Sequence, residues 1–197
     1  MKRYHARPLE TQAEVDQARN ILFEVYHKEI GWHPESENPS GLHVQIGAYG
    51  AMLVDKYDDT ALWFGCFDRE TLVAVHRSHR AIDNNFELDA YKSVPPQFKD
   101  SESVELTRLA IRKEYRTVSP AFIVLLAEEF RYLRESGIKY AFGTAIMEGG
   151  PGKLYMKAGM EVHDGLTFKY DEADPFEVSL LYYNFKENTA VDRLIAM

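Results

Sequence analysis

The chain has 197 residues, a formal net charge of -8 and a hydrophobic share of 45%. This length predicts one domain over residues 1–197, and the composition is that of a folded globular protein. The acidic balance argues against general nucleic-acid binding, which draws most of its affinity from clustered positive charge. No apolar run approaches the ~20 residues of a membrane-spanning helix.

The N-terminus and the single cysteine, Cys66, bear on the compartment. The first ten residues are basic but lack the apolar stretch of a signal peptide, and one cysteine cannot form an internal disulfide. We therefore expect a cytoplasmic location.

The N-terminal quarter reads as a helix followed by a long loop. Apolar residues recur at helical spacing over residues 11–30, with Thr11 and Glu14 as a capping box and Gly31 as the end. The loop predicted over residues 32–50 is longer than most loops in compact domains, and such loops are usually functional or mobile.

The rest of the chain predicts strands alternating with helices. Ser119 and Pro120 are an N-cap and N1 pair for a helix that ends near Gly137, and the last dozen residues look like a tail. This order predicts an α+β fold in which a mixed β-sheet is flanked by helices. The other predicted elements are a hairpin of strands 60–67 and 71–79, a short helix and loop over 86–98, strand 138–145, a short helix after Gly149 and Gly150 that ends at Gly159, and strands 160–170 and 176–185.

The stretch from Ser103 to Pro120, SVELTRLAIRKEYRTVSP, places an acid and a base inside an apolar strand. Charged side chains are costly in such a strand unless they are paired or used for chemistry. Glu105 and Arg108 are three residues apart, so a regular strand would point them to opposite faces. A β-bulge between them would bring both into one cleft and free a backbone N–H, a possible donor to a carbonyl oxygen.

The residues E-L-T-R-L-A, followed by a helix, resemble the fourth strand of the GNAT acyltransferase superfamily. More closely, they resemble the E-x-x-R signature of its acyl-homoserine-lactone synthase and long-chain N-acyl amino acid synthase branch. Other family positions follow in order along the chain, and the run L-Y-M-K-A-G-M is similar to a motif near the end of many GNAT domains. These positions are Tyr26, Trp32, Asp55 with Asp58, Arg77 and Tyr155.

One position departs from the resemblance. The family's arginine ahead of the aromatic residue would fall at Leu22, and Arg19, nearly one turn earlier, is the candidate substitute. This loss weakens any claim that the substrate is that of the homoserine-lactone enzymes.

The resemblance implies catalytic roles for Glu105 and Tyr155. Glu105 would accept the proton of the amine, through a water, unless it is only a structural ion-pair partner of Arg77 or Arg108. Tyr155 would protonate the leaving thiolate, unless it is simply an aromatic residue of the core.

Four further residues, with Tyr26 and Trp32, are expected at the substrate site. Asp55 and Asp58 would attract a cationic amine, although an Asp-rich turn before a strand is commonly just a turn. Arg77 and Arg108 would hold a substrate carboxylate or lock the two aspartates in place. We favour the second alternative.

The acyl donor is expected to be a co-substrate, with no cofactor bound. CoA-dependent GNAT enzymes generally have R/Q-x-x-G-x-G/A at the helix start, whereas this chain has R-K-E-Y-R-T-V-S-P, without glycine. The same lack is typical of the synthase branch, which uses acyl-phosphopantetheine on acyl carrier protein. Arg112, Lys113 and Arg116 would dock that acidic partner, unless they are an ordinary solvated face.

The histidines show no metal-binding spacing, so no metal site is predicted. The first hypothesis is an autoinducer-synthase-like N-acyltransferase that moves a fatty acyl group from acyl carrier protein to a small amino-acid-like amine. The alternatives are an acetyl- or acyl-CoA-dependent GNAT N-acyltransferase and a non-catalytic module that binds acyl chains or acyl carrier protein. The identity of the amine, and whether S-adenosylmethionine is used, stay open.

Overall fold

The computed structural model describes residues 3–117, 120–148, 151–170, 172 and 174–195. The chain divides into two compact units, the first formed by residues 1–79 with 108–129 and the second by 80–107 with 130–197. The single domain over residues 1–197 stays a prediction. The two units share the central strand, β6 (Ser103–Ile111).

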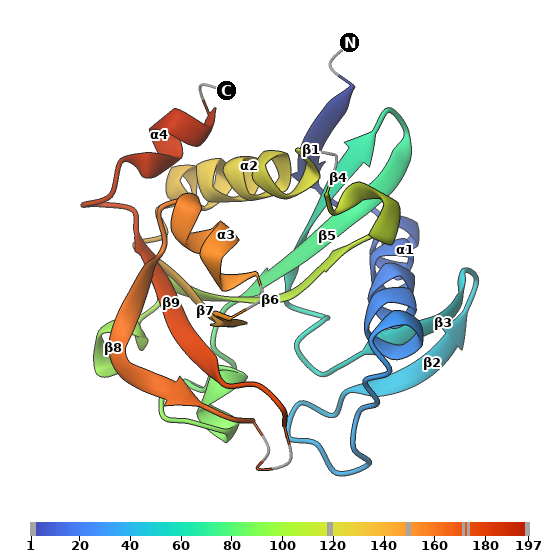
Figure 1. Ribbon diagram of the computed structural model, residues 1–197, viewed down its shortest axis with the longest axis horizontal. Helices are drawn as coiled ribbons and strands as arrows, with labels where there is room; N and C mark the ends of the chain where they lie inside the picture. The colour runs from blue at the N-terminus through green and yellow to red at the C-terminus, as the bar shows by residue number, and fades with distance from the viewer. Residues whose placement is uncertain (1–2, 118–119, 149–150, 171, 173, 196–197) are drawn as a thin grey trace. The chain divides into compact units, whose positions relative to one another are not determined.

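Seven strands form a mixed sheet in the order β1-β4-β5-β6-β7-β9-β8, with helices flanking it (Figure 1). The predicted α+β fold is therefore confirmed. The other strands are β1 (Tyr4–Pro8), β2 (His43–Gly47), β3 (Gly50–Val54), β4 (Leu62–Asp68), β5 (Thr71–His79), β7 (Tyr140–Ile146), β8 (Glu161–Phe168) and β9 (Val178–Asn184). The α-helices are α1 (Gln12–Leu22), α2 (Ala121–Glu135), α3 (Gly152–Lys157) and α4 (Ala190–Ile195).

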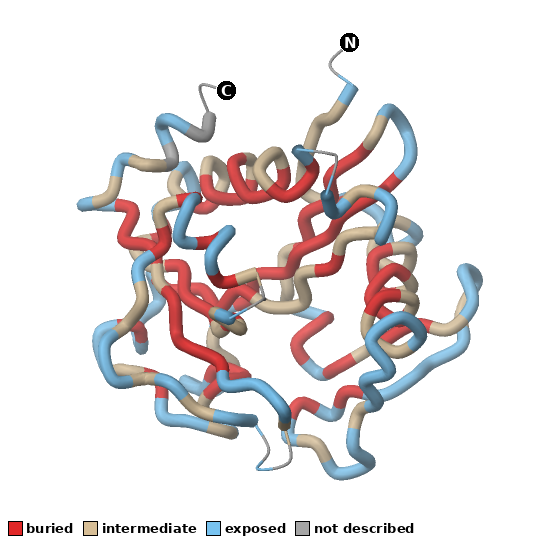
Figure 2. The backbone as a smooth tube through the Cα atoms, viewed as in Figure 1, coloured by how far each residue is buried: buried red, intermediate tan, exposed pale blue. Residues whose placement is uncertain are grey.

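The first unit is built on the predicted hairpin, which is confirmed as antiparallel β4 and β5. Arg69 turns the chain between them with φ 58. Strand β5 is buried at every residue after Thr71, as Figure 2 shows. Strand β1, which pairs with β4, was not predicted, because Arg7 and Pro8 hide its alternation.

The predicted capping box is confirmed, and so is the helix predicted over residues 11–30, but its second part is not α-helical. Thr11 Oγ1 accepts from the Glu14 N–H at 3.2 Å, and Glu14 Oε2 accepts from the Thr11 N–H at 3.2 Å. After Leu22 the chain continues as a π-helix, η1 (Phe23–Glu29). A π-turn adds one residue to each turn, and apolar spacing over two turns does not distinguish it from an α-helix.

The loop predicted over residues 32–50 is also partly wrong, because β2 and β3 form a two-stranded antiparallel sheet there. Four of the five β2 residues are exposed, so the strand lacks the apolar alternation that would have identified it. The side-chain amide of Asn20 on α1 donates to the Ala51 carbonyl at 2.9 Å and ties this sheet to the helix.

The second unit continues the sheet from the first half of β6. There β6 pairs in parallel with β7, with Glu105 opposite Phe142, and β7 pairs antiparallel with β9. A Cβ added at Gly143 would lie 2.5 Å from the Leu106 carbonyl oxygen, so the two backbones approach closely at this glycine. An apolar cluster lies beside them, formed by Phe86, Leu88, Val94, Phe98, Phe142 and Leu180.

Two shorter helices of this unit lie in the segment predicted as helix and loop: η2 (Leu88–Ala90) and η3 (Pro96–Phe98). The predicted tail contains helix α4, which a six-residue segment of mixed composition does not signal. The predicted cap at Ser119 and the turn at Gly149 and Gly150 lie outside the described residues.

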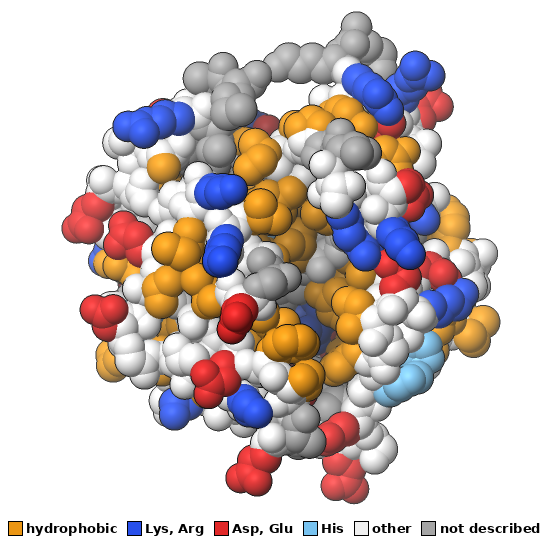
Figure 3. Space-filling view, in the orientation of Figure 1, with side chains coloured by type: hydrophobic (Ala, Val, Ile, Leu, Met, Phe, Trp, Pro, Cys, Tyr) orange, Lys and Arg blue, Asp and Glu red, His pale blue; other side chains and the backbone are white. Residues whose placement is uncertain are grey.

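Within the described residues, no helix is long and apolar enough to cross a membrane. Figure 3 shows that Lys and Arg side chains are interspersed with Asp and Glu side chains on the face drawn.

Candidate functional site

Five of the first unit's charged residues form a connected group, which we call the acid–arginine cluster. Arg77 Nη1 lies 2.6 Å from Asp55 Oδ1 and 2.7 Å from Asp58 Oδ1. Arg108 meets the other oxygen of Asp55, at 2.7 Å from Nη2 and 3.2 Å from Nε. Arg19 Nε lies 3.2 Å from Asp58 Oδ2, an ion-pair contact without hydrogen-bond alignment.

A short turn between β3 and β4 presents both aspartates. The Tyr57 N–H donates to Asp55 Oδ1 at 2.9 Å, and the Asp55 N–H donates to Asp58 Oδ2 at 3.0 Å. Such Asx contacts are the usual role of aspartate in turns. Each aspartate therefore shapes the backbone and binds a guanidinium at the same time.

The cluster is buried, so its charges interact strongly. The Asp55 and Asp58 side chains are 1% and 2% exposed, and the Arg77 side chain is 0% exposed. Burial would raise the pKa of Asp55, but the positive charges of Arg108 and Arg77 outweigh it and lower the pKa to about 2. Burial and the negative charge of Asp55 raise the pKa of Asp58, against the effect of Arg77 and Arg19.

These contacts are the ones expected if the arginines lock the aspartates in place. The sequence also indicated Arg19 as the substitute for the arginine missing at Leu22. Arg19 contacts Asp58 and also Asp16, at 3.2 Å from its Nη1 to the Asp16 Oδ1. Leu22, by contrast, is 1% exposed in the apolar core.

Arg108 has an irregular backbone for a residue within a strand. Its φ is 59, the left-handed region, which occurs at bulges and turns. The sequence predicted an irregularity between Glu105 and Arg108, and the structure has it at Arg108 itself. Glu105 belongs to the second unit and Arg108 to the first, and their common cleft stays a prediction.

Tyr26 lies within η1, and Trp32 follows shortly after the end of that helix. The Tyr26 hydroxyl donates to the Leu109 carbonyl at 2.9 Å, next to the irregular Arg108. Trp32 is 41% exposed and meets the edge of the Tyr26 ring at 6.2 Å between centroids. The two aromatic residues are thus in contact, and Tyr26 also contacts β6.

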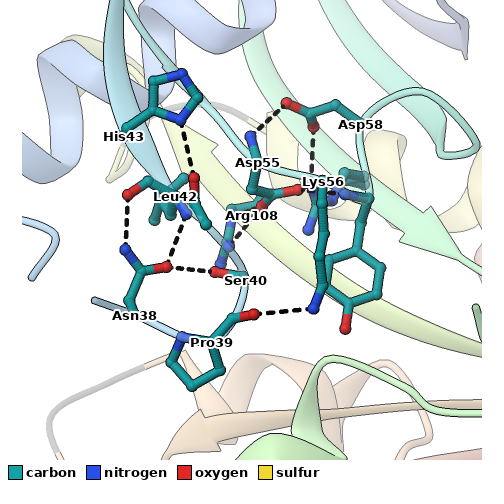
Figure 4. Close-up of polar contacts among 12 residues, drawn as sticks. Asn38, Pro39, Ser40, Leu42, His43, Asp55, Lys56, Asp58 and Arg108 are labelled. Atoms are coloured by element: carbon teal, nitrogen blue, oxygen red, sulfur yellow. Dashed lines mark hydrogen bonds and ion pairs between the residues drawn. The ribbon is translucent and has the colours of Figure 1, made fainter. Parts of the chain in front are cut away.

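The segment after Trp32 is held in a defined conformation by one side chain, that of Asn38 (Figure 4). Its amide nitrogen donates to the carbonyls of Glu35 and Leu42, each at 2.7 Å. Its oxygen accepts from the Leu42 N–H at 2.7 Å and from the Ser40 hydroxyl at 2.9 Å. This segment borders a hollow of about 300 Å³, whose lining includes His27, His33 and His43.

Lys56 connects this segment to the acid–arginine cluster. Its Nζ donates to the Pro39 carbonyl at 2.9 Å (Figure 4), and its backbone N–H donates to the Ser40 carbonyl at 3.1 Å. The turn that carries Asp55 and Asp58 is therefore tied to the loop. Sequence reasoning missed both Asn38 and Lys56, because loop hydrogen bonds leave no periodic signal.

Glu105 is a buried carboxylate, 3% exposed, in the second unit. The Leu88 N–H, at the start of η2, donates to it at 3.2 Å from Oε1 and 3.3 Å from Oε2. A backbone donor favours the ionised form of a carboxylate, the form that a general base needs.

Tyr155 lies on α3 of the same unit and is 7% exposed. Its backbone N–H donates to the Pro151 carbonyl at 3.1 Å and its carbonyl accepts from Met160, so the residue lies in a well-bonded short helix. Its role as an acid stays a prediction.

The basic residues expected to dock a carrier protein make contacts within the first unit. Arg112 Nε donates to the Leu72 carbonyl at 3.0 Å. Arg116 pairs with Glu29 at 2.6 Å and donates to the Ile111 carbonyl at 2.8 Å. Lys113 is exposed.

One buried pair was missed by sequence reasoning. His76 Nδ1 on β5 lies 2.6 Å from Glu129 Oε2 on α2, and both side chains are buried. In the sequence, the only indication of this pair is Glu129 itself, a charged residue beside the apolar face of the predicted helix. No group of three or more His, Cys, Asp or Glu residues in the described part of the chain has a metal-binding arrangement.

No protein-family model matches the chain, and no curated protein matches its sequence. Solved structures do match. FeeM, an N-acyl amino acid synthase from uncultured soil microbes, is 18% identical with a TM-score of 0.65, covering 94% of this chain and 92% of its own. BjaI, a CoA-dependent acyl-homoserine lactone synthase solved with SAM and isopentyl-CoA, is 17% identical with a TM-score of 0.69, covering 98% and 89%.

A putative N-acetyltransferase from Lactobacillus plantarum is 15% identical with a TM-score of 0.64, covering 92% of this chain and 98% of its own. At these identities the likeness shows the fold. The GNAT fold, and the structural resemblance to the N-acyl amino acid and acyl-homoserine-lactone synthases, are thereby confirmed.

Proposed function

We propose that this chain, which has the GNAT acyltransferase fold, is an N-acyltransferase that moves an acyl group from a thioester to the amine of a small amino-acid-like substrate. The observation that carries the proposal is Glu105: a carboxylate buried in an apolar strand and held by the Leu88 N–H. Burying a charged group costs free energy, and a role as proton acceptor during turnover would explain why the protein keeps this carboxylate.

In the proposed reaction, the amine nitrogen attacks the thioester carbonyl carbon. Glu105 accepts the proton that the amine loses, and the carbonyl oxygen carries negative charge until the carbon–sulfur bond breaks. Tyr155 then donates its phenolic proton to the leaving thiolate. Both side chains lie in the second unit.

The acceptor class follows from the charges of the acid–arginine cluster. Arg77, Arg108 and Arg19 already neutralise Asp55 and Asp58, so the aspartates have little charge left to attract a cation. The Arg108 side chain is 14% exposed whereas that of Arg77 is 0% exposed, so Arg108 is the more accessible of these two arginines. A guanidinium at the accessible end favours an amine that also carries a carboxylate, as an amino acid does.

The donor predicted from the sequence is acyl carrier protein, and acyl-CoA is the alternative. The ion pair of Arg116 with Glu29 reduces the charge that Arg116 offers to an anionic donor, and both candidate donors are anionic. BjaI, the neighbour described above, is a CoA-dependent synthase.

The experiment offers the purified protein two donors that carry the same acyl chain, one on CoA and one on acyl carrier protein, with amino acids and their amides as acceptors. Thiol release and the mass of the N-acylated product are measured. We expect transfer to amino acids and weaker transfer to the amides. Thioester binding with no product above that of Glu105→Gln would contradict the proposal and favour a non-catalytic acyl-binding module.

A further inference from the structure

The backbone N–H of Leu88, which donates to Glu105, belongs to a segment whose position can shift. Leu88 belongs to η2, a single turn of 3₁₀-helix, and short 3₁₀ segments have poor hydrogen-bond geometry. The bonds from the Leu88 N–H to the two oxygens, 3.2 and 3.3 Å, are at the long end of the normal range. A small shift of residues 86–94 would therefore break them.

One side chain fixes that segment at both ends. Asp89 Oδ2 accepts from the Phe86 N–H at 3.1 Å, and Asp89 Oδ1 accepts from the Val94 N–H at 3.0 Å. The Lys99 Nζ lies 2.7 Å from the same Oδ1. The Asp89 side chain is 9% exposed, so these contacts are well shielded from solvent.

The segment is also anchored by apolar contacts. Phe86, Leu88 and Val94 all belong to the apolar cluster, and each is 2% exposed or less. These contacts hold the side chains in the core, but they are not directional. The direction of the Leu88 N–H is set by hydrogen bonds, and Asp89 supplies two of them on either side of Leu88.

We propose that Asp89 is a positioning residue for the reaction proposed above: by bonding the Phe86 and Val94 amides, it holds the Leu88 N–H against the Glu105 carboxylate. This inference rests on the proposed function, because it assigns Glu105 the proton transfer. Asp89 acts through Leu88, and Leu88 keeps Glu105 ionised and oriented.

The test variant is Asp89→Asn, which keeps the size of the side chain but loses the charge and one acceptor oxygen. Losing a hydrogen bond to a charged group corresponds to about a tenfold to hundredfold effect, so we expect kcat to fall about tenfold. The KM values for donor and acceptor should stay the same. A purely structural role would instead lower the amount of folded protein and leave the kcat of that protein unchanged.

The matched control is Asp100→Asn in the same unit. Asp100 also caps a turn, accepting from the Glu102 N–H at 3.0 Å and from the Ser103 hydroxyl at 2.7 Å, whereas the Leu88 N–H that donates to Glu105 lies outside this turn. We expect its kcat to stay within about twofold of the parent, since surface substitutions usually have small effects. An equal fall in both variants would overturn the proposal.

A second readout needs no activity. The amide proton resonance of Leu88, measured by NMR, should move upfield in Glu105→Gln because the charge-assisted bond weakens. Asp89→Asn should move it in the same direction, and Asp100→Asn should leave it in place. An unchanged Leu88 resonance in folded Asp89→Asn would overturn the proposal even if activity falls.

Asp89→Glu provides the decision if Asp89→Asn does not fold. It keeps the charge but places the carboxylate one methylene farther from the backbone, which disturbs the bonds to the Phe86 and Val94 amides, so the Leu88 resonance should move in the same direction. An unchanged resonance would then overturn the proposal. If the parent protein transfers no acyl group with either donor, the proposed function fails, whereas the resonance still tests the link between Asp89 and Glu105.

Discussion

The buried charges of the two units differ in the contacts described for them. In the acid–arginine cluster, carboxylates and guanidiniums bind one another. The single side chain of Arg77, for example, contacts two aspartates. At Glu105, one contact is the backbone N–H of Leu88, a residue of the apolar cluster. Several charged contacts fix the aspartates of the first arrangement, whereas the role proposed for Glu105 requires its carboxylate to take up a proton.

This difference predicts which substitutions lower the free energy of unfolding and which lower the turnover rate. Breaking a buried ion pair leaves an uncompensated charge and is costly to stability. Glutamine at position 105 keeps a side-chain oxygen that can accept from the Leu88 N–H but loses the proton acceptor. We therefore expect the cluster to respond mainly in stability and Glu105 mainly in rate.

The largest expected effect is that of Arg77→Ala. Removing this guanidinium leaves Asp55 and Asp58 buried with fewer counter-charges, which should lower the free energy of unfolding by about 3–5 kcal/mol. Urea unfolding measures it. Arg3→Ala, which breaks an exposed pair with Asp68, should change stability little and serves as the control.

A double-mutant cycle sharpens this result. If Arg77 and Asp58 act as a pair, Arg77→Ala with Asp58→Ala should destabilise less than the sum of the two single substitutions. Strictly additive losses would mean that the two residues stabilise the unit separately.

Next is Glu105→Gln, which should lower kcat by a factor of ~100 or more, since general-base catalysis typically contributes that much. Its free energy of unfolding should change less than that of Arg77→Ala. The measurement is thiol release at saturating amine. Near-full activity in a folded variant would remove Glu105 from the chemistry.

The pH dependence of stability tests the cluster in another way. The pKa of Asp55 is lowered to about 2 in the folded protein, below the unfolded value of about 3.9, so its stabilisation is present above pH 4 and lost as pH falls toward 2. Asp58, whose pKa is raised, acts in the opposite direction. The stability gap between the parent and Asp55→Asn should shrink by about 2 kcal/mol between pH 5 and pH 2. A gap that stays constant over this range would contradict the lowered pKa of Asp55.

The smallest effect is expected at the surface pair of Arg116 and Glu29. Exposed pairs contribute at most about 1 kcal/mol, so Arg116→Glu should change the KM of either donor by less than about fivefold. The measurement compares acyl-CoA with acyl carrier protein at low and high salt. A large loss confined to the carrier protein, and removed by salt, would establish Arg116 as a docking residue.

The sequence was most informative where a residue's local pattern decides its structure. The Thr11 capping box, the β4–β5 hairpin and strand β6 follow from short-range spacing and were predicted correctly. Strand β2 was missed because its exposed residues do not alternate, and η1 because its spacing resembles that of an α-helix over two turns.

Some contacts of the candidate site could be anticipated from the sequence and others could not. The pairing of Asp55 with Arg77 and Arg108 was favoured from the sequence, because buried charges need partners. The Leu88 N–H at Glu105, the Asn38 contacts and the His76–Glu129 pair depend on segments far apart in the chain. No periodicity in the sequence encodes them.

The left-handed backbone of Arg108 has a consequence for how this position can vary. A side chain at φ 59 costs about 1–2 kcal/mol relative to glycine, which adopts this conformation freely. Arg108→Gly would relieve that strain and lose the ion pair with Asp55 in the same step, whereas Arg108→Ala would lose the pair and keep the strain. The two variants separate the conformational cost of this residue from the electrostatic contribution of its guanidinium, a separation that few positions in a strand permit.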